Sequence, residues 1–148
     1  MYYIQLLVVI KKNIFMKLIV KLLGILILLL GILLLIKPEV IFGWMEDNME
    51  NTSLYISVIV FRLLFGILLI IAAKESKYPG AIKFFGYLAV IAAIVFILIG
   101  QESFQDFVSS LIPDFNHYSP VSGLVGIAFG GFLIYAFTTK KELKQEIN

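Results

Sequence analysis

Cysteine is absent from the 148 residues, and histidine occurs once. Without cysteine there is no disulfide, no thiolate nucleophile and no zinc–thiolate or iron–sulfur site. The one histidine, His117, has too few potential ligands around it in the sequence for a transition-metal centre. Paired carboxylates at membrane depth, a serine–histidine pair and a phosphate-binding glycine loop are also missing. We therefore expect no catalytic activity, no metal and no cofactor.

Charged residues are scarce, at 15% of the chain, and 61% of the residues are hydrophobic. A typical soluble domain is about 25% charged and 45–50% apolar. The mean hydropathy of +1.01 also lies far on the apolar side. This composition predicts an integral membrane protein, and the net charge of +2 gives no support for nucleic-acid binding.

Four apolar runs account for the high hydropathy, and each is close to the roughly 20 residues that cross a bilayer as a helix. They cover about 18–36, 54–73, 82–100 and 120–137. Because the runs are continuous and do not alternate with polar residues, they indicate helices and not barrel strands. The predicted fold is all-α, a polytopic membrane domain over residues 16–138 with a basic tail at 139–148.

The first 15 residues are apolar but are interrupted by Lys11 and Lys12, so they are too short to span a bilayer. We interpret them as an interfacial segment, or as residues before a true start at Met16. The leucine-rich run after Met16 resembles a signal peptide, but no small-residue cleavage site follows it. We expect this run to remain as a membrane anchor.

Basic residues cluster in alternate connections. The first and third connections hold only Lys37 among the bases, together with seven acids. The positive-inside rule then places both termini in the cytoplasm. We expect a multi-pass protein of the cell (plasma) membrane, and the isoleucine- and lysine-rich composition favours a prokaryotic source. The ten inner bases are Lys11, Lys12, Lys17, Lys21, Lys74, Lys77, Lys83, Lys140, Lys141 and Lys144.

The two halves of the chain resemble each other, which suggests two tandem hairpins and an internal duplication. Spans one and three match at an offset of 62, and spans two and four match at an offset of 64. Such copies would be related by a pseudo-twofold axis along the membrane normal. The matching positions are Lys21 with Lys83, Gly24 with Gly86, Gly31 with Ala93, and Phe65-Gly66 with Phe129-Gly130.

The connections carry local signals of their own. Residues 40–45 and 104–115 have apolar side chains at helical spacing, which predicts interfacial helices. Tyr78-Pro79-Gly80 predicts a tight turn, so spans two and three should be adjacent and antiparallel. Ser119-Pro120 predicts an N-cap and first turn at the start of the last span.

Small residues mark the helix faces that can approach closely in lipid. We expect them to pack the four spans together. A contact between copies through the GxxxG step in the last span is the alternative, which the sequence leaves open. The residues are Gly24, Gly31, Gly66, Gly86, Ala93, Gly126 and Gly130.

Arg62 is the one charge well inside a span, where insertion costs about 2.5–3.5 kcal/mol. It shares a helix face with Tyr55 and Gly66, so this face should point inward. Glu102 is the first choice of partner, and Arg62, Glu102 and Tyr55 are the candidate binding residues. Arg62 is either a structural residue that extends toward the interface or a site for an anion or lipid phosphate.

The leading functional hypothesis is a non-enzymatic accessory subunit that packs against itself or a larger membrane complex. A minimal oligomeric transporter or channel for an anion or lipid, with Arg62 on its path, is the alternative. Apart from Arg62, the spans carry few polar groups with which to line a wet path, namely Ser57, Tyr87, Ser122 and Tyr135. The expected partners are the lipid bilayer and other membrane proteins.

Overall fold

The computed structural model describes residues 1–138, without the side chains of residues 111–117, and all regular secondary structure in this part of the chain is helical. Four stretches are long and apolar enough to cross a membrane: Tyr2–Ile36, Thr52–Glu75, Pro79–Ser110 and Tyr118–Phe137. The prediction of an all-α chain with four candidate spans is confirmed. The elements are α1 (Tyr2–Ile36), α2 (Pro38–Asn48), α3 (Thr52–Ala72), a short 3₁₀ turn η1 (Ala73–Glu75) and α4 (Pro79–Phe137).

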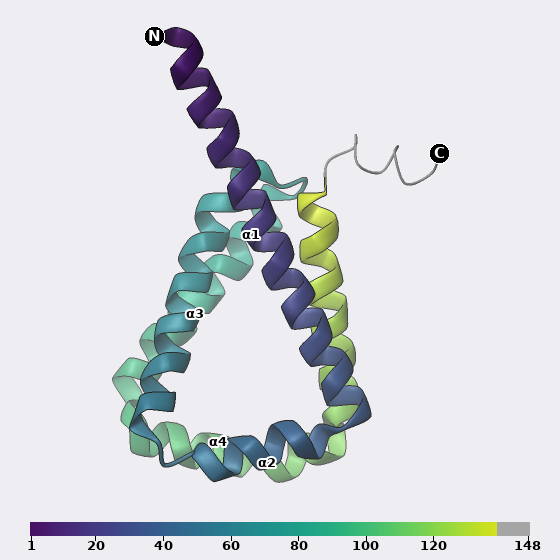
Figure 1. The fold of residues 1–148 in the computed structure, drawn as a ribbon. Coiled ribbons are helices and arrows are strands. Elements are labelled where there is room, and N and C mark those ends of the chain that lie inside the picture. The colour runs from purple at the N-terminus through teal and green to yellow at the C-terminus, as the bar shows by residue number, and fades with distance from the viewer. Residues whose placement is uncertain (139–148) are drawn as a thin grey trace.

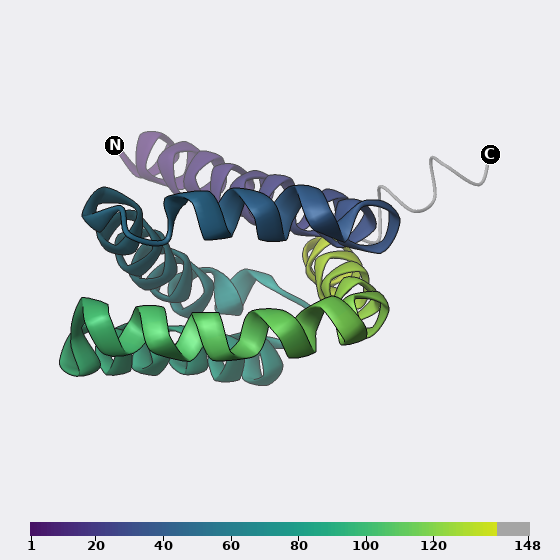
Figure 2. The same ribbon diagram turned by 90° about the horizontal axis from the view of Figure 1, so that it is seen from below.

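The four spans form two helix pairs (Figure 1). The α1 pair consists of α1 and the last part of α4, residues 118–137, and the α3 pair consists of α3 and the first part of α4, residues 79–99. The pairs converge at one end and diverge toward the other. There, α2 and the middle of α4 cross from one pair to the other (Figure 2).

This pairing differs from two hairpins that pack as separate units. The span after α2 lies in the other pair, so α1 and α3 diverge instead of packing along their length (Figure 1). Spans two and three are adjacent, as the Tyr78-Pro79-Gly80 turn predicts, because Gly66 of α3 lies against Gly86 of α4. The long helix α4 therefore contributes one span to each pair.

Two breaks set the direction of the crossing segments. Lys37 leaves the helical region at φ −142° and ψ 70°, and Pro38 then begins α2. Within α4, Gly100 has φ 77° and ψ 174°, a conformation available almost only to glycine. The predicted start at Ser119-Pro120 is wrong, because the only non-helical backbone that interrupts α4 is at Gly100. A proline near a bend needs no cap if the helix continues through it.

The buried core lies where the two pairs converge. Phe137, Leu69, Ile82, Leu133 and Val20 are its largest fully buried side chains. Three alanines complete it, and both pairs contribute to the cluster. The backbone N–H of Lys77 donates to the carbonyl of Ala136 over 2.8 Å, which ties the turn between α3 and α4 to the last span. The core cluster is Val20, Leu69, Ala72, Ala73, Ile82, Leu133, Ala136 and Phe137.

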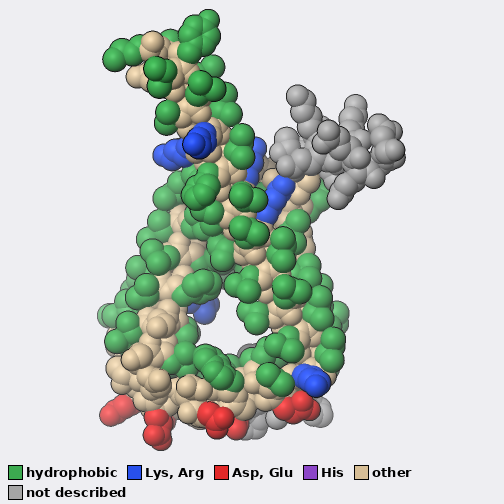
Figure 3. Space-filling view, viewed as in Figure 1, with side chains coloured by type: hydrophobic (Ala, Val, Ile, Leu, Met, Phe, Trp, Pro, Cys, Tyr) green, Lys and Arg blue, Asp and Glu red, His purple; other side chains and the backbone are tan. Residues whose placement is uncertain are grey.

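Charge separates along the axis of the spans (Figure 3). We call the convergent end, with Lys74, Lys77 and Lys83, the basic end. The opposite end, which holds α2 and residues 101–110, is the acidic end. Between the two pairs the space-filling view shows an opening bordered by hydrophobic side chains, which we call the window (Figure 3). The window opens on the side face of the molecule that Figure 3 shows.

Residues 2–15 continue α1 without a break beyond the basic end (Figure 1). The helix has 35 residues, which corresponds to about 52 Å at 1.5 Å per residue. A hydrocarbon core is about 30 Å thick, so α1 is longer than one crossing requires. The interfacial placement of its first residues stays a prediction.

Candidate functional site

Glycines of the α1 pair lie against one another over two turns of each helix, from Gly24 to Gly31 on α1 and from Gly123 to Gly130 on α4. A Cβ on Gly130 would come within 2.6 Å of the Gly24 carbonyl oxygen, and a Cβ on Gly31 would come within 2.9 Å of the Gly123 oxygen. Gly126 also faces Gly31, at 3.2 Å from its Cα. The GxxxG face of the last span is therefore occupied by α1 and is not free to contact a second copy.

The α3 pair uses fewer glycines. A Cβ on Gly66 would lie 2.8 Å from the Gly86 oxygen, and Gly86 would meet the Gly66 oxygen at 2.9 Å. Ala93 is fully buried in the same pair. Toward the acidic end, larger side chains replace the glycines, and this is where Arg62 and Tyr55 lie.

Arg62 is half-buried on α3. Its guanidinium carbon lies 5.4 Å from the centroid of the Phe96 ring, within the range of a cation–π contact. Its Nε is buried and has no hydrogen-bond partner among the residues that the structure describes. A buried donor without an acceptor costs free energy, because water satisfies it in the unfolded chain. Arg62 is therefore positioned by an aromatic ring but has an unused donor.

Tyr55 also contacts Phe96 of α4, through its hydroxyl group. Its hydroxyl donates to the carbonyl oxygen of Phe96 over 2.6 Å. Because the helix is interrupted at Gly100, Phe96 lies in the last turn, where carbonyls lack helical partners. The Tyr55 ring is 5.2 Å from that of Phe104, and the Phe104 ring is 5.0 Å from that of Phe96. Tyr55 and Arg62 thus converge on Phe96, a residue that the sequence analysis missed.

Glu102 does not join this cluster. It lies after the break at Gly100 and lines a polar pocket of about 650 Å³ at the acidic end, together with Glu50 and Gln101. Among the described residues no ion pair connects it to Arg62. Near that pocket, Gln105 donates from Nε2 to the Met49 carbonyl over 2.8 Å, so the start of the crossing segment of α4 is fastened to the link between α2 and α3.

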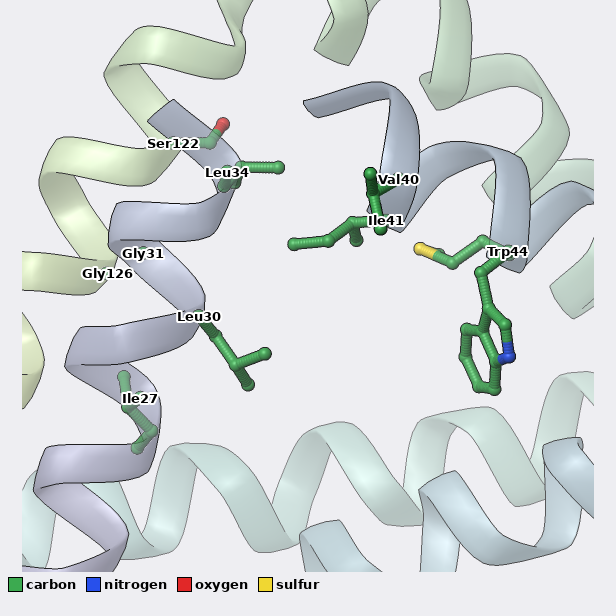
Figure 4. Close-up of a pocket in the computed structure, with 10 residues that line it drawn as sticks. Ile27, Leu30, Gly31, Leu34, Val40, Ile41, Trp44, Ser122 and Gly126 are labelled. Atoms are coloured by element: carbon green, nitrogen blue, oxygen red, sulfur yellow. The ribbon is translucent and has the colours of Figure 1, made fainter. Parts of the chain in front are cut away.

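Apolar pockets follow the window from the α1 pair to Arg62. One has a volume of about 610 Å³ and lies between α1 and α2. Leu30 of α1 points toward α2 across it, and Ile41 of α2 points back toward α1 (Figure 4). Its lining residues are Ile27, Leu30, Gly31, Leu34, Val40, Ile41, Trp44, Met45, Ser122 and Gly126.

Two smaller pockets continue from it. Trp44 and Met45 also line a pocket of about 180 Å³ beside Tyr55. Val58 belongs to that pocket and to a third one, of about 320 Å³, which contains Arg62. Because neighbouring pockets share these lining residues, the three lie in a row that is apolar at the α1 pair and cationic at the α3 pair. The third pocket is lined by Val58, Phe61, Arg62, Phe65, Phe85, Leu88, Ala89 and Phe129.

The described residues form no candidate metal-binding cluster. Within the described residues, no three His, Cys, Asp or Glu side chains come together as ligands. The His117 side chain lies outside the part that the structure describes. The described site consists of a row of mainly apolar pockets with one guanidinium at its end.

Comparison of the chain with protein-family models, curated proteins and solved structures gives no match.

Proposed function

We propose that the protein is non-enzymatic and binds membrane lipid between its two helix pairs. The observation that carries this proposal is the window, which is open at its sides and bordered by hydrophobic side chains (Figure 3). In a bilayer, acyl chains fill an apolar space of this kind unless another helix does so, because lipid tails are as apolar as leucine. The choice between these two occupants decides the function.

The glycine contacts favour lipid over a helix. Transmembrane helices associate mainly where small residues let their backbones approach. In this protein, Gly24, Gly31, Gly66, Gly86 and Gly130 are already used inside the pairs. The surfaces that remain around the window are rich in leucine, isoleucine and phenylalanine. Flexible acyl chains adapt to such irregular surfaces better than a second rigid helix does.

The pocket between α1 and α2 supports the same proposal. Ligand pockets usually measure about 300–1,000 Å³ and are mostly apolar. At about 610 Å³ this pocket is within that range. Its side opening allows an acyl chain to enter from the bilayer without crossing the polar surface.

Native mass spectrometry of the full chain, extracted gently from its membrane, tests the proposal. We expect retained lipid on the wild-type protein and less on Leu30→Trp, which fills the pocket between α1 and α2. Leu29→Trp is the matched control, because Leu29 is also exposed on α1 but does not line that pocket. A lipid-free wild-type mass, or equal lipid on both variants, would contradict lipid binding in the window.

We also propose that the chain arose by duplication of a two-span unit. The eight core residues form four pairs at the offsets found in the sequence: Val20 and Ile82 at 62, and Leu69 and Leu133, Ala72 and Ala136, Ala73 and Phe137 at 64. The contact of Gly24 with Gly130 corresponds in the same way to that of Gly86 with Gly66. Pro38, at the first break, corresponds to Gly100 at the second.

The orientation that we propose has the basic end in the cytoplasm of a prokaryotic cell, with both termini on that side. The segregation of lysines from carboxylates along the spans supports it. Because the chain has no cysteine, single cysteines report sidedness without a background. In intact cells, a membrane-impermeant maleimide should label Glu46→Cys in α2 and leave Glu75→Cys in η1 unlabelled. The reverse pattern would invert the topology.

A second candidate is the accessory or self-associating subunit, favoured by the first turns of α1. Tyr2, Tyr3, Ile4, Leu7 and Val8 are exposed on a helix that extends beyond both pairs. Crosslinking and mass measurement of the full chain and of a variant lacking residues 1–15 would test this role. A defined homo-oligomer or heteromeric complex that depends on these residues would support it, and a monomer in both cases would argue against it.

A further inference from the structure

The pocket around Arg62 places a permanent positive charge inside an aromatic wall. A guanidinium has five N–H donors and no acceptor, and it stays protonated in proteins. Here it faces Phe96, and its pocket is lined by Phe61, Phe65, Phe85 and Phe129 among others. Because these rings lower the local polarity around the half-buried Arg62, an anion that reached the guanidinium would interact with it more strongly than at a fully exposed site.

The other helix pair shows that this charge is not needed for helix packing. At the offset of 64, the position of Arg62 corresponds to Gly126, which lies against Gly31 in a close backbone contact. Two spans of this kind therefore pack with a glycine at that place. In the α3 pair, the arginine costs insertion energy and leaves Nε without an acceptor. Its presence calls for a ligand.

The neighbouring pockets indicate what kind of ligand carries the anion. Val58 links the Arg62 pocket to the pocket beside Tyr55, and Trp44 and Met45 link that one to the pocket between α1 and α2. The lining of the pocket between α1 and α2 is almost wholly apolar. A ligand that occupied this row of pockets would be an amphiphile with an anionic head and a long apolar part.

We infer that Arg62 binds the phosphate group of an amphiphile whose apolar part lies along the pockets toward α1. The inference rests on the proposed lipid binding and adds the headgroup to it. Phosphate suits the planar guanidinium fork, which can donate two parallel hydrogen bonds to its oxygens. Nε is one of the donors of that fork, and it is the atom without a partner in the structure. The same chemistry would admit inorganic phosphate, so the test separates the two sources.

The test uses the full chain in neutral detergent, with phosphatidic acid and phosphatidylcholine of identical acyl chains, measured by native mass spectrometry. We expect the wild-type protein to prefer phosphatidic acid by about tenfold, the amount that one charge-assisted contact supplies. Arg62→Leu should remove the preference, and Arg62→Lys should keep part of it, because lysine retains the charge without the fork. Lys83→Leu, which removes an exposed lysine of the basic end, is the charge-matched control and should keep the full preference.

Inorganic phosphate provides the second arm of the test. If it competes with phosphatidic acid, or raises the melting temperature of the wild-type protein but not of Arg62→Leu, the site recognises phosphate in either source. If Arg62→Leu keeps the wild-type lipid preference, and phosphate has no Arg62-dependent effect, the inference is overturned.

The outcomes also separate this inference from the proposed function. Retention of both lipids to the same extent by the wild-type protein and Arg62→Leu, with loss in Leu30→Trp, would leave lipid binding in place and remove the role of Arg62. Absence of either lipid from the wild-type protein would remove the proposed function itself. Arg62-dependent binding of inorganic phosphate would then be the only surviving part.

Discussion

The α1 pair and the α3 pair hold their helices together differently. In the α1 pair, glycines from both helices meet over about two helical turns. In the α3 pair, the glycine contact is confined to Gly66 and Gly86, nearer the basic end. Toward the acidic end, Tyr55 and Arg62 reach across to Phe96 instead. The glycines of the α1 pair are Gly24, Gly31, Gly123, Gly126 and Gly130.

This difference in packing leaves a pocket in one pair and none between the glycines of the other. Backbones in direct contact leave no room between two helices, whereas side chains that bridge them leave gaps at their sides. The pocket of about 320 Å³ around Arg62 is such a gap. Its ring walls hold the guanidinium, and the α1 pair has no charge at the corresponding place. The lipid-headgroup site that we propose therefore lies in the pair that is packed less closely.

The largest expected effect comes from disturbing the closer pair. A Cβ on Gly130 would lie 2.6 Å from the Gly24 oxygen and 2.7 Å from the Leu28 nitrogen, both of which are backbone atoms. We expect Gly130→Val to lower the free energy of unfolding by about 3 kcal/mol or more, because the helices must separate. Denaturation of the detergent-solubilised protein with sodium dodecyl sulfate measures the change.

The neighbouring residue provides the control. Gly131 has no heavy atom within 4 Å of a built Cβ. Gly131→Val should change stability by less than about 0.5 kcal/mol, since valine and glycine differ little in helix propensity. Equal losses in the two variants would mean that the glycine contact does not hold the α1 pair together.

The equivalent substitution in the α3 pair should cost less. A Cβ on Gly66 would lie 2.7 Å from Cγ2 of Val90, which is a side-chain atom, and 2.8 Å from the Gly86 oxygen. We expect Gly66→Val to cost about 2 kcal/mol and Val90→Ala to relieve about 1 kcal/mol of it in a double-mutant cycle. Additive effects, or a loss larger than that of Gly130→Val, would contradict the ranking of the two pairs.

The sequence was sufficient for the spans because hydropathy accumulates within each run of about 20 residues and needs no knowledge of neighbours. The small-residue faces and the shared face of Tyr55 and Arg62 follow from helical periodicity for the same reason. Pairing of α1 with α4 did not follow. Each span carries a face of small residues, and the sequence does not indicate which two faces are in contact.

The local misses have physical causes too. Phe96 contacts Arg62 through its ring and Tyr55 through its backbone carbonyl. Every residue has a backbone carbonyl, so the sequence does not indicate which carbonyl accepts such a hydrogen bond. Ser119-Pro120 fits a helix start, yet the helix runs through it. The conformational break occurs instead at Gly100, whose φ of 77° no sequence pattern revealed. Glu102 follows that break and is thereby separated from Arg62.

The next largest expected effect concerns the helix break at Gly100, at the end of the α3 pair. Alanine at position 100 would have to adopt φ 77° and ψ 174°, which costs about 1–3 kcal/mol for a residue with a Cβ. We therefore expect Gly100→Ala to destabilise the protein by about 1.5 kcal/mol in the same denaturation assay. Gly43→Ala within α2 is the control: no heavy atom lies within 4 Å of its built Cβ, and alanine should stabilise α2 by up to about 1 kcal/mol. A neutral Gly100→Ala would show that the break does not depend on glycine.

The smallest expected effect concerns the hydrogen bond from Tyr55 of α3 to α4. Tyr55→Phe keeps the ring contact with Phe104 but removes the hydrogen bond to the Phe96 carbonyl. Hydrogen bonds between membrane helices contribute about 0.6 kcal/mol on average, so we expect a loss of that size. Tyr87→Phe, at an exposed tyrosine of the same pair, should have no effect.

The contacts of Tyr55 and Arg62 with Phe96 predict that substitutions of these two side chains are energetically coupled. Arg62 contacts the ring of Phe96 and Tyr55 its carbonyl, so each helps to fix the position of Phe96 for the other. A double-mutant cycle of Tyr55→Phe and Arg62→Leu should therefore give a non-zero interaction energy, of about 0.5 kcal/mol. Tyr87→Phe combined with Arg62→Leu should be additive. Coupling in the second cycle and not in the first would mean that Phe96 does not connect the two residues, and that the Arg62 pocket is held open by other contacts.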